Sequence, residues 1–284
     1  MRGSNNASRL GLLFLLAALV TACAGTAPEQ RRAQAEKLAI DAGWQRITLD
    51  AGMFALAAFL PQDLHQTKTL TIYIEGDGLA WVGSSTPSFD PTPNNPLALK
   101  LALSDHIDTA VYLARPCQYV NGDDRRGCEQ KYWTSHRFAP EVIEASNIAV
   151  SQLKERYAAD KLRIIGYSGG GAVAALIAAR RADVKQLITI AGNLDHAVWT
   201  RQHRLSPLYG SLNPADAWQQ LQDVPQQHYV GELDTNIKAS VAQAFASRFA
   251  ADKQPIITMM PGFDHHCCWE RLWQGLPEED YIEN

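Results

Sequence analysis

The chain has 284 residues, of which 46% are hydrophobic and 20% are charged, and its formal net charge is −4. This length accommodates one large α/β domain, and the composition is ordinary for a globular protein. The negative net charge excludes a generally basic surface of the kind that binds nucleic acid, so no nucleic-acid partner is expected.

The first 22 residues are predicted to be a targeting signal rather than part of the fold. Arg2 and Arg9 give the segment a positive start, and an apolar run of 11 residues, "LGLLFLLAALV" (10–20), follows them. That run is too short to span a bilayer comfortably as a permanent helix. Residues 1–22 are therefore assigned to a signal peptide.

The residues "VTAC" (20–23) end this segment. An apolar residue, two small residues and a cysteine resemble the lipobox of bacterial lipoproteins, which implies cleavage before Cys23 and lipidation of that cysteine. Ala24 comes next, and by resemblance to Gram-negative lipoproteins it favours anchoring in the outer membrane, facing the periplasm. The alternative is an ordinary secretory signal cut near "TACA", with Cys23 inert.

The rest of the chain alternates between short apolar runs and longer helical patterns. Residues 23–43 are predicted to be a lipidated tether and a polar helix, and residues 44–284 a single domain. The predicted strands cover 44–51, 53–61, 69–76, 109–116, 161–167, 184–192, 226–234 and 255–262. The predicted helices cover 96–105, 139–158, 170–182, 214–221, 237–252 and 267–276.

Strands separated by helices predict an α/β fold, in which a mostly parallel central sheet carries helices on both faces. No linker rich in proline, glycine or serine divides the chain after residue 44. The loop-rich stretch from about 192 to 213 leaves room for only a small lid region. The sequence does not indicate an oligomeric state.

The segment "GYSGG" (166–170) matches G-x-S-x-G, the pattern of a nucleophile elbow. An apolar strand precedes it and a helix of small residues follows, as that turn requires. Gly166 and Gly170 would let the strand and the helix approach closely. Ser168 would then stand above the sheet edge, with the N–H of Gly169 directed at a developing oxyanion.

A serine hydroxyl is a weak nucleophile until a base removes its proton. An acid and a histidine follow Ser168 in the order Ser, Asp, His, each just past the end of a predicted strand. The candidates are Asp234 in "HYVGELDTN" and His265 in "IITMMPGFDHHCCW". Catalytic groups gather at this edge of open α/β sheets.

The motifs "GYSGGG", "VGELD" and "PGFDH" are similar to those of the α/β-hydrolase superfamily, and the resemblance extends from about residue 44 to 275. It implies Ser168 as the nucleophile, Asp234 as the acid and His265 as the base. His266 is the alternative base, and Asp195 the reserve acid, because some hydrolases take their acid from that position. Glu232 and His228 are the less favoured neighbours, and His228 is expected to be a core or edge residue.

In this family a second oxyanion donor comes from the loop after the third strand. That loop is "EGDGLAW" (75–81), and the N–H of Asp77, or less firmly of Gly78, is the expected donor. Glu75 stands where the family often has histidine, so the loop departs from the usual pattern. Further along, Arg115, Tyr119, Trp133 and Arg137 are candidates for lining the site, as are residues 193–199 and 206–214.

Besides Cys23 the chain has four cysteines, an even number that favours disulfides in an oxidising compartment. A local Cys117–Cys128 bridge is the first choice, which would leave Cys267 and Cys268 as a bond between neighbours or as two thiols. Cross-paired arrangements stay open. A metal site at "HHCC" (265–268) is disfavoured, because four adjacent side chains cannot all converge on one ion.

The sequence therefore predicts a serine hydrolase that cleaves an ester or thioester, or less readily an amide, of a small-molecule acyl substrate. Its mechanism needs neither a metal nor an organic cofactor. One alternative is a non-catalytic, lipid-anchored binding module that retains the fold. Another is a redox role for Cys267 and Cys268, whose activity would survive Ser168→Ala.

Overall fold

The computed structural model of the protein describes residues 27–106 and 109–275. Its centre is an eight-stranded sheet with the strand order β1-β2-β4-β3-β5-β6-β7-β8. The strands are β1 Trp44–Ala51, β2 Phe54–Pro61, β3 Thr69–Ile74, β4 Thr109–Leu113, β5 Lys161–Tyr167, β6 Val184–Ile190, β7 Gln226–Gly231 and β8 Ile256–Met260. β2 pairs antiparallel with β1 and with β4, and all the other neighbours are parallel.

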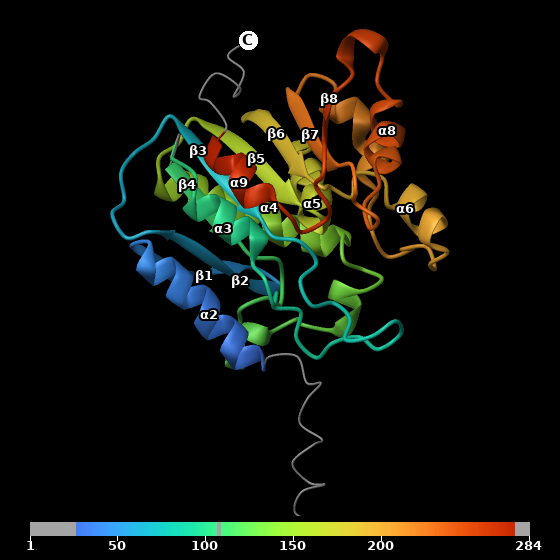
Figure 1. The fold of residues 1–284 in the computed structure, drawn as a ribbon. Helices are drawn as coiled ribbons and strands as arrows, with labels where there is room; N and C mark the ends of the chain where they lie inside the picture. The colour runs from blue at the N-terminus through green and yellow to red at the C-terminus, as the bar shows by residue number, and fades with distance from the viewer. Residues whose placement is uncertain (1–26, 107–108, 276–284) are drawn as a thin grey trace, which may run out of the picture.

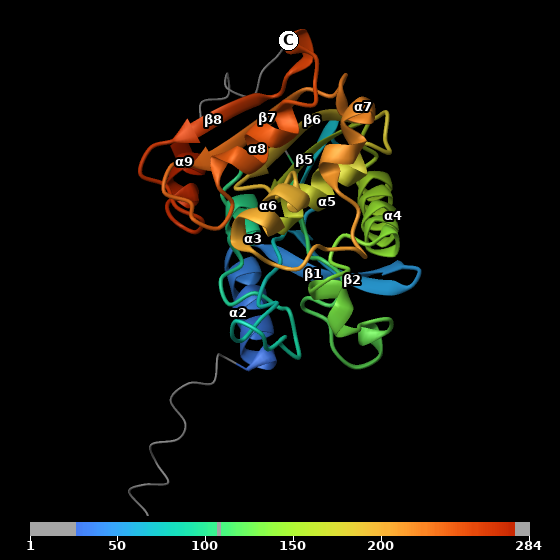
Figure 2. The same ribbon diagram turned by 90° about the vertical axis from the view of Figure 1, so that its right-hand side faces the viewer.

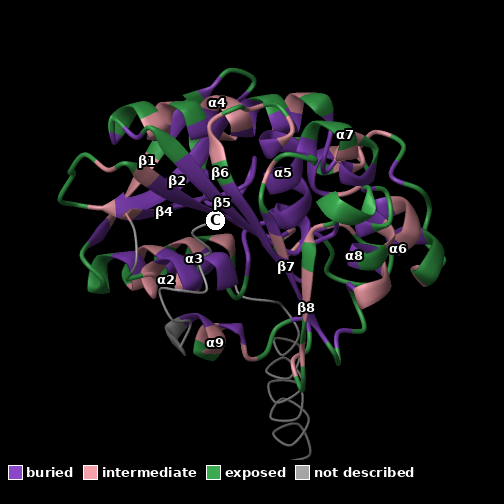
Figure 3. Cartoon of the chain, turned by 90° about the horizontal axis from the view of Figure 1, so that it is seen from above, coloured by how far each residue is buried: buried purple, intermediate pink, exposed green. Residues whose placement is uncertain are grey.

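Two groups of helices cover the two faces of the sheet (Figures 1 and 3). The helices are α2 Pro28–Asp41, α3 Leu97–Leu103, α4 Pro140–Arg156, α5 Gly169–Ala178, α6 His196–His203, α7 Trp218–Leu221, α8 Ala239–Ala246 and α9 Trp269–Gly275. Side chains of α4, α5 and α8 share one apolar core with the sheet, and side chains of α2, α3 and α9 share the other. Burial of both faces explains why the central strands read as almost continuous apolar runs.

The alternation in the sequence predicted this single α/β domain and its mostly parallel sheet, and the structure confirms both. Most of the helices and strands begin or end a few residues from the predicted positions. Several strands, for example, end earlier than predicted, and their last predicted residues lie in loops. One α-helix was missed: α6 lies inside the stretch predicted to be loop-rich. Figure 2 shows α6 beside α8, against which it packs.

Helix α2 precedes the domain boundary predicted at residue 44, yet it packs on β1 and α3. Ala35 and Ala39 are buried in the apolar core, and Arg31 is 4% exposed. Within the part of the chain that the structure describes, no helix combines the length and the apolar character needed to cross a bilayer. The predicted signal peptide and Cys23 lie outside the described residues.

Candidate active site

Ser168 occupies the sharp turn between β5 and α5, and its backbone has φ 53° and ψ −121°. A non-glycine residue rarely adopts a positive φ, and holding it there costs on the order of 1–3 kcal/mol. Two glycines make the turn possible. A Cβ on Gly166 would overlap the backbone of Gly170, and a Cβ on Gly170 would overlap the carbonyl oxygens of residues 74 and 75. The strained turn presents Ser168 at the carboxyl edge of the sheet.

The structure brings together the three side chains that the sequence singled out. Nε2 of His265 lies 3.1 Å from Oγ of Ser168, and Nδ1 of His265 lies 2.8 Å from Oδ2 of Asp234. All three residues are less than a tenth exposed. Both distances allow hydrogen bonds, so a proton on Ser168 can pass to an imidazole whose other nitrogen is held by a carboxylate.

The acid and the base are each held by their own loops. Oδ1 of Asp234 accepts hydrogen bonds from the backbone N–H groups of Asn236 and Ile237, both at 2.8 Å, which leaves Oδ2 for His265. The carbonyl oxygen of His265 accepts the hydroxyl of Tyr167 at 3.0 Å and the indole N–H of Trp269 at 3.3 Å. The sequence did not single out Tyr167 or Trp269, although both lie in the quoted segments, because a hydrogen bond to the His265 carbonyl oxygen depends on the tertiary fold.

The alternative residues point elsewhere. Nδ1 of His266 lies 3.1 Å from the Tyr167 hydroxyl, and partial burial lowers the pKa of His266. Asp195 caps the N-terminus of α6, accepting N–H groups from residues 197 and 198. Glu232 accepts the N–H of Gly262. His228 is fully buried, which lowers its pKa to about 3, and it bonds Thr189 rather than facing the serine.

The expected oxyanion donors, Gly169 and Asp77, lie beside each other and next to Ser168. Gly169 is the first residue of α5. Asp77, in the loop after β3, lies so close to it that a Cβ on Gly169 would overlap the Asp77 carboxylate. Among the described residues, neither the N–H of Gly169 nor that of Asp77 has a hydrogen-bond acceptor. Both groups are therefore available to a ligand.

Two arginines hold the Asp77 carboxylate in place. Nη1 of Arg115 bonds Oδ1 and Nη1 of Arg137 bonds Oδ2. Burial alone would raise the pKa of Asp77, but the two guanidinium groups outweigh it and hold this pKa below its usual range. Of the four candidate lining residues, Arg137 lines a cavity beside the serine, and Arg115 lies behind it, bonded to Asp77. Tyr119 and Trp133 are instead buried in the apolar core.

Glu75, which replaces the family's usual histidine, is a buried structural residue of the same loop. Its carboxyl group accepts the N–H of Gly76 at 2.9 Å and the hydroxyl of Tyr112 at 3.2 Å. Burial raises the pKa of Glu75 to about 7, although these hydrogen bonds act in the opposite direction. Gly78, the less favoured oxyanion residue, has a positive φ of 64° and lets the loop turn against Pro91.

No protein-family model matches the sequence, and no curated protein matches it. Many solved structures match the fold. An alpha-beta serine hydrolase homologue from Coxiella burnetii aligns with a TM-score of 0.54 and 15% identity, covering 81% of this chain and 95% of the other. Est1E from Butyrivibrio proteoclasticus aligns with a TM-score of 0.56 and 16% identity, covering 84% and 98%. An a/b serine hydrolase without lid from Xanthomonas campestris aligns with a TM-score of 0.53 and 14% identity, covering 85% and 96%.

The chain has the α/β-hydrolase fold. The resemblance seen in three short motifs thus extends to the architecture of most of the chain. At this level of identity the likeness shows the α/β-hydrolase fold, and the chemistry has to be inferred from the side chains of this chain.

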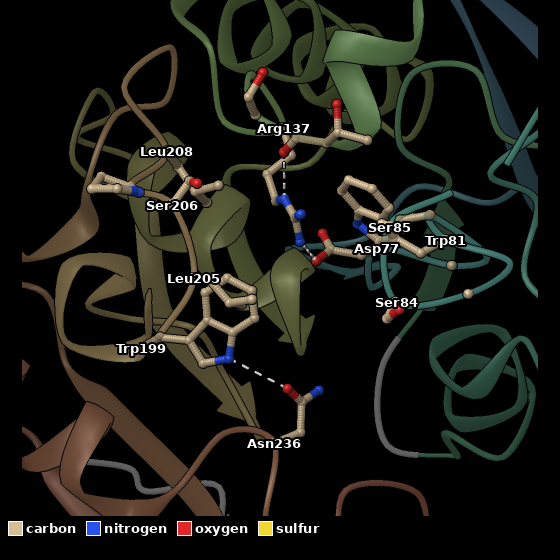
Figure 4. A pocket seen from close by; sticks show the side chains of 16 residues that line it. Asp77, Trp81, Ser84, Ser85, Arg137, Trp199, Leu205, Ser206, Leu208 and Asn236 are labelled. Carbon is tan, nitrogen blue, oxygen red and sulfur yellow. Dashed lines mark hydrogen bonds and ion pairs between the residues drawn. The ribbon is translucent and has the colours of Figure 1, made fainter. Parts of the chain in front are cut away.

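Two adjoining cavities open at the carboxyl edge of this α/β-hydrolase sheet. The first has a volume of about 540 Å³ and is lined by Ser168 and His265 together with the loop after β3. The second, of about 850 Å³, shares Asp77, Gly78 and Asn236 with the first (Figure 4). Of the two stretches predicted to form a wall, Trp199 and residues 206–208 line the second cavity.

Two disulfides lie on the α/β-hydrolase domain. Cys117 is bonded to Cys128, with Cα atoms 5.6 Å apart, as the local pairing predicted, and Cys267 is bonded to its neighbour Cys268. Among the described residues no cluster of three or more His, Cys, Asp or Glu side chains is arranged to hold a metal ion. A redox role for the second pair stays a prediction.

Proposed function

We propose that this protein is a serine hydrolase that cleaves an ester or thioester through an acyl-enzyme. One observation carries the proposal: Ser168, His265 and Asp234 form a continuous hydrogen-bonded chain, and Ser168 and His265 line a cavity. A positive φ at Ser168 supports it, because a fold used only as a scaffold has no need of this strain.

In the proposed mechanism, Oγ of Ser168 attacks the acyl carbonyl carbon while Nε2 of His265 takes the hydroxyl proton. The carbonyl oxygen becomes an oxyanion, which accepts hydrogen bonds from the N–H groups of Gly169 and Asp77. When the tetrahedral intermediate collapses, the bond to the leaving group breaks and His265 returns the proton to it. Asp234 orients the imidazole and stabilises its protonated form.

A water molecule then hydrolyses the acyl-enzyme. His265 takes a proton from the water as its oxygen attacks the acyl-enzyme carbonyl, and the proton returns to Oγ of Ser168 as the acid product leaves. No step needs a metal or an organic cofactor. An ester or thioester is favoured over an amide because its leaving group departs more readily.

The test is hydrolysis of a panel of 4-nitrophenyl esters by the full-length protein purified in detergent. We expect turnover that Ser168→Ala abolishes, while the far-ultraviolet circular dichroism of the variant is unchanged. Equal rates for the variant and the original protein would contradict the proposal. Turnover of none of the esters, together with an unreactive Ser168, would favour a non-catalytic binding module.

We also propose that Cys23 carries a lipid anchor that holds the enzyme at a bacterial outer membrane, facing the periplasm. The sequence "VTAC" before residue 24 supports this, and so does the run of apolar residues before it. The test is incorporation of radiolabelled palmitate in cells, followed by membrane fractionation. Cys23→Ala should lose both the label and the membrane association, whereas a labelled variant would contradict the assignment.

A further inference from the structure

The larger cavity beside Ser168 has no part in the proposed mechanism. Its volume of about 850 Å³ exceeds that of the cavity containing the serine, and the two share lining residues. A substrate whose carbonyl lies at Ser168 can therefore extend one arm into this space. The side chains in Figure 4 come from the loop after β3, the segment before α4, α6 with the loop that follows it, and the loop after β7.

Two arginines meet one carboxylate beside this cavity. Asp77 and Arg137 are its only charged lining residues. The two oxygens of Asp77 are each bonded to an arginine, Arg115 behind the cavity wall and Arg137 at its surface. Two guanidinium groups thus share one carboxylate, and the buried Glu75, with a pKa of about 7, also attracts Arg115 and offsets part of the second positive charge. A guanidinium group that faces the cavity favours an anion there.

The guanidinium group of Arg137 is the cationic group that lines the cavity. Its side chain is only 6% exposed, its Nε donates to the carbonyl oxygen of Thr134 at 2.7 Å, and its Nη1 bonds Asp77. Within residues 27–106 and 109–275, Nη2 of Arg137 has no hydrogen-bond partner. In Figure 4 the guanidinium points toward the middle of the cavity, and it lies 5.6 Å from the centre of the Trp199 ring. The group is thus fixed in place with donors left free.

Apart from Asp77 and the amide of Asn236, the walls around Arg137 are mostly apolar or hydroxyl-bearing. The apolar side chains are those of Ala80, Trp81, Trp199, Leu205, Pro207 and Leu208. Hydroxyl groups come from residues 84, 85, 134, 135 and 206. This lining suits an apolar chain or ring that ends in one anionic group.

We propose that the substrate of Ser168 is an anionic ester, with a carboxylate or phosphate on the arm that enters this cavity and binds Arg137. The inference rests on the proposed hydrolase function. A planar guanidinium with free N–H groups recognises either anion by charge-assisted hydrogen bonds. Such bonds contribute enough for a preference of roughly 10- to 100-fold over a neutral substrate.

The first experiment uses the full-length protein in detergent and three matched substrates. 4-Nitrophenyl hexanoate is compared with the same ester ending in a carboxylate and with the same ester ending in a phosphate. A second set places the anion on the alcohol, as the acetate of 6-hydroxyhexanoate against hexyl acetate. In one of the two sets we expect kcat/KM to be at least about 10-fold higher for an anionic ester than for the neutral ester of that set. Equal values for neutral and anionic members of both sets would overturn the proposal while leaving the hydrolase function standing.

The second experiment assigns the preference to Arg137. Arg137→Gln also loosens Asp77, so the ratio of kcat/KM for the anionic and neutral esters is measured within each variant. We expect the ratio to fall toward one in Arg137→Gln and to be partly kept in Arg137→Lys, which retains the charge but not the planar fork. The matched control is Arg248→Gln, which removes one exposed positive charge away from the cavity and should keep the ratio. An unchanged ratio in Arg137→Gln would overturn the proposal.

The third experiment measures binding without turnover. Ser168→Ala protein is titrated calorimetrically with the neutral and anionic esters. Tighter binding of an anionic ester, lost in the Ser168→Ala, Arg137→Gln double variant, supports the subsite even if no ester is hydrolysed by the original protein. If the esters are hydrolysed and Ser168→Ala binds neutral and anionic members equally, the hydrolase function stands and the subsite fails.

Discussion

The carboxylate of Asp77 lies directly against the α-carbon of Gly169, so closely that there is no space for a Cβ on residue 169. The contact joins the loop after β3 to the first residue of α5, next to Ser168. It also explains why a glycine follows the serine. The Asp77 side chain occupies the space that a side chain on residue 169 would need. The two proposed oxyanion donors, Asp77 and Gly169, are therefore held beside each other.

Gly169→Ala should therefore damage the site more than the fold. The new methyl group would push Asp77 away or tilt the start of α5, and displacements of about 1 Å at a reacting centre cost roughly 100-fold in rate. We expect kcat/KM for a neutral ester to fall by about that factor. Steady-state kinetics beside a thermal melt will check this, and an alanine variant with full activity would contradict the placement of the loop.

Asp234→Asn should lower kcat by about 10⁴-fold, because an amide cannot hold His265 in the tautomer that accepts the serine proton. Asp195→Asn is the matched control. Asp195 caps α6, and asparagine caps a helix about as well, so that variant should keep its activity and most of its stability. Comparable losses in the two variants would contradict the assignment of Asp234.

The buried carboxyl group of Glu75 should make stability depend on pH. Its pKa of about 7 lies above the ordinary value of 4.5, so the folded protein holds this proton more tightly than the unfolded chain does. The stabilisation is complete below about pH 4.5 and is lost as pH rises through about 7, an effect of about 3 kcal/mol in the free energy of unfolding.

Urea unfolding between pH 4 and 8 will measure this effect, with Glu75→Gln as the comparison. The variant should match the original protein near the acid end and exceed its stability above pH 7, because glutamine carries no proton to lose. If the free energies of unfolding of the two proteins changed with pH in parallel, Glu75 would not titrate in this range.

Asp90 should contribute strongly to stability. It is 5% exposed and pairs with Arg31, Arg32 and Arg125, so it ties α2 to the loop that leads toward the larger cavity. Removing one partner from a buried ion pair costs about 3–5 kcal/mol, and we expect that loss for Asp90→Ala. Asp50, whose bridge to Arg126 is largely exposed, is the control, and Asp50→Ala should cost about 1 kcal/mol or less. Equal losses in urea unfolding would contradict the importance of the buried cluster.

The sequence was most informative where local patterns determine structure. Residues 161–167 were predicted as a strand and are β5, because a short segment rich in Leu and Ile that ends at a glycine-flanked serine is typical of the strand before a nucleophile elbow. The Ser, Asp, His order placed the three side chains correctly at one edge, since parallel strands end at the same side of a sheet.

The features that the sequence did not predict depend on contacts between distant parts of the chain. Helix α6 has a weak apolar pattern and depends on its Asp195 cap and on packing against α8. The pairing of Arg115 and Arg137 with Asp77 joins three separate loops, and no spacing in the sequence encodes it. Helix α2 looked polar because only a narrow stripe, centred on Ala35 and Ala39, is buried.

The central claim is that His265 activates Ser168, and covalent labelling tests it without knowledge of the substrate. The full-length protein in detergent is treated with a fluorophosphonate, and the modified peptide is mapped by mass spectrometry. We expect one adduct, on Ser168, formed at a rate that falls at least 100-fold in His265→Ala and stays within a few-fold in His266→Ala. An unmodified Ser168 in the folded protein, or equal labelling in His265→Ala, would contradict the claim.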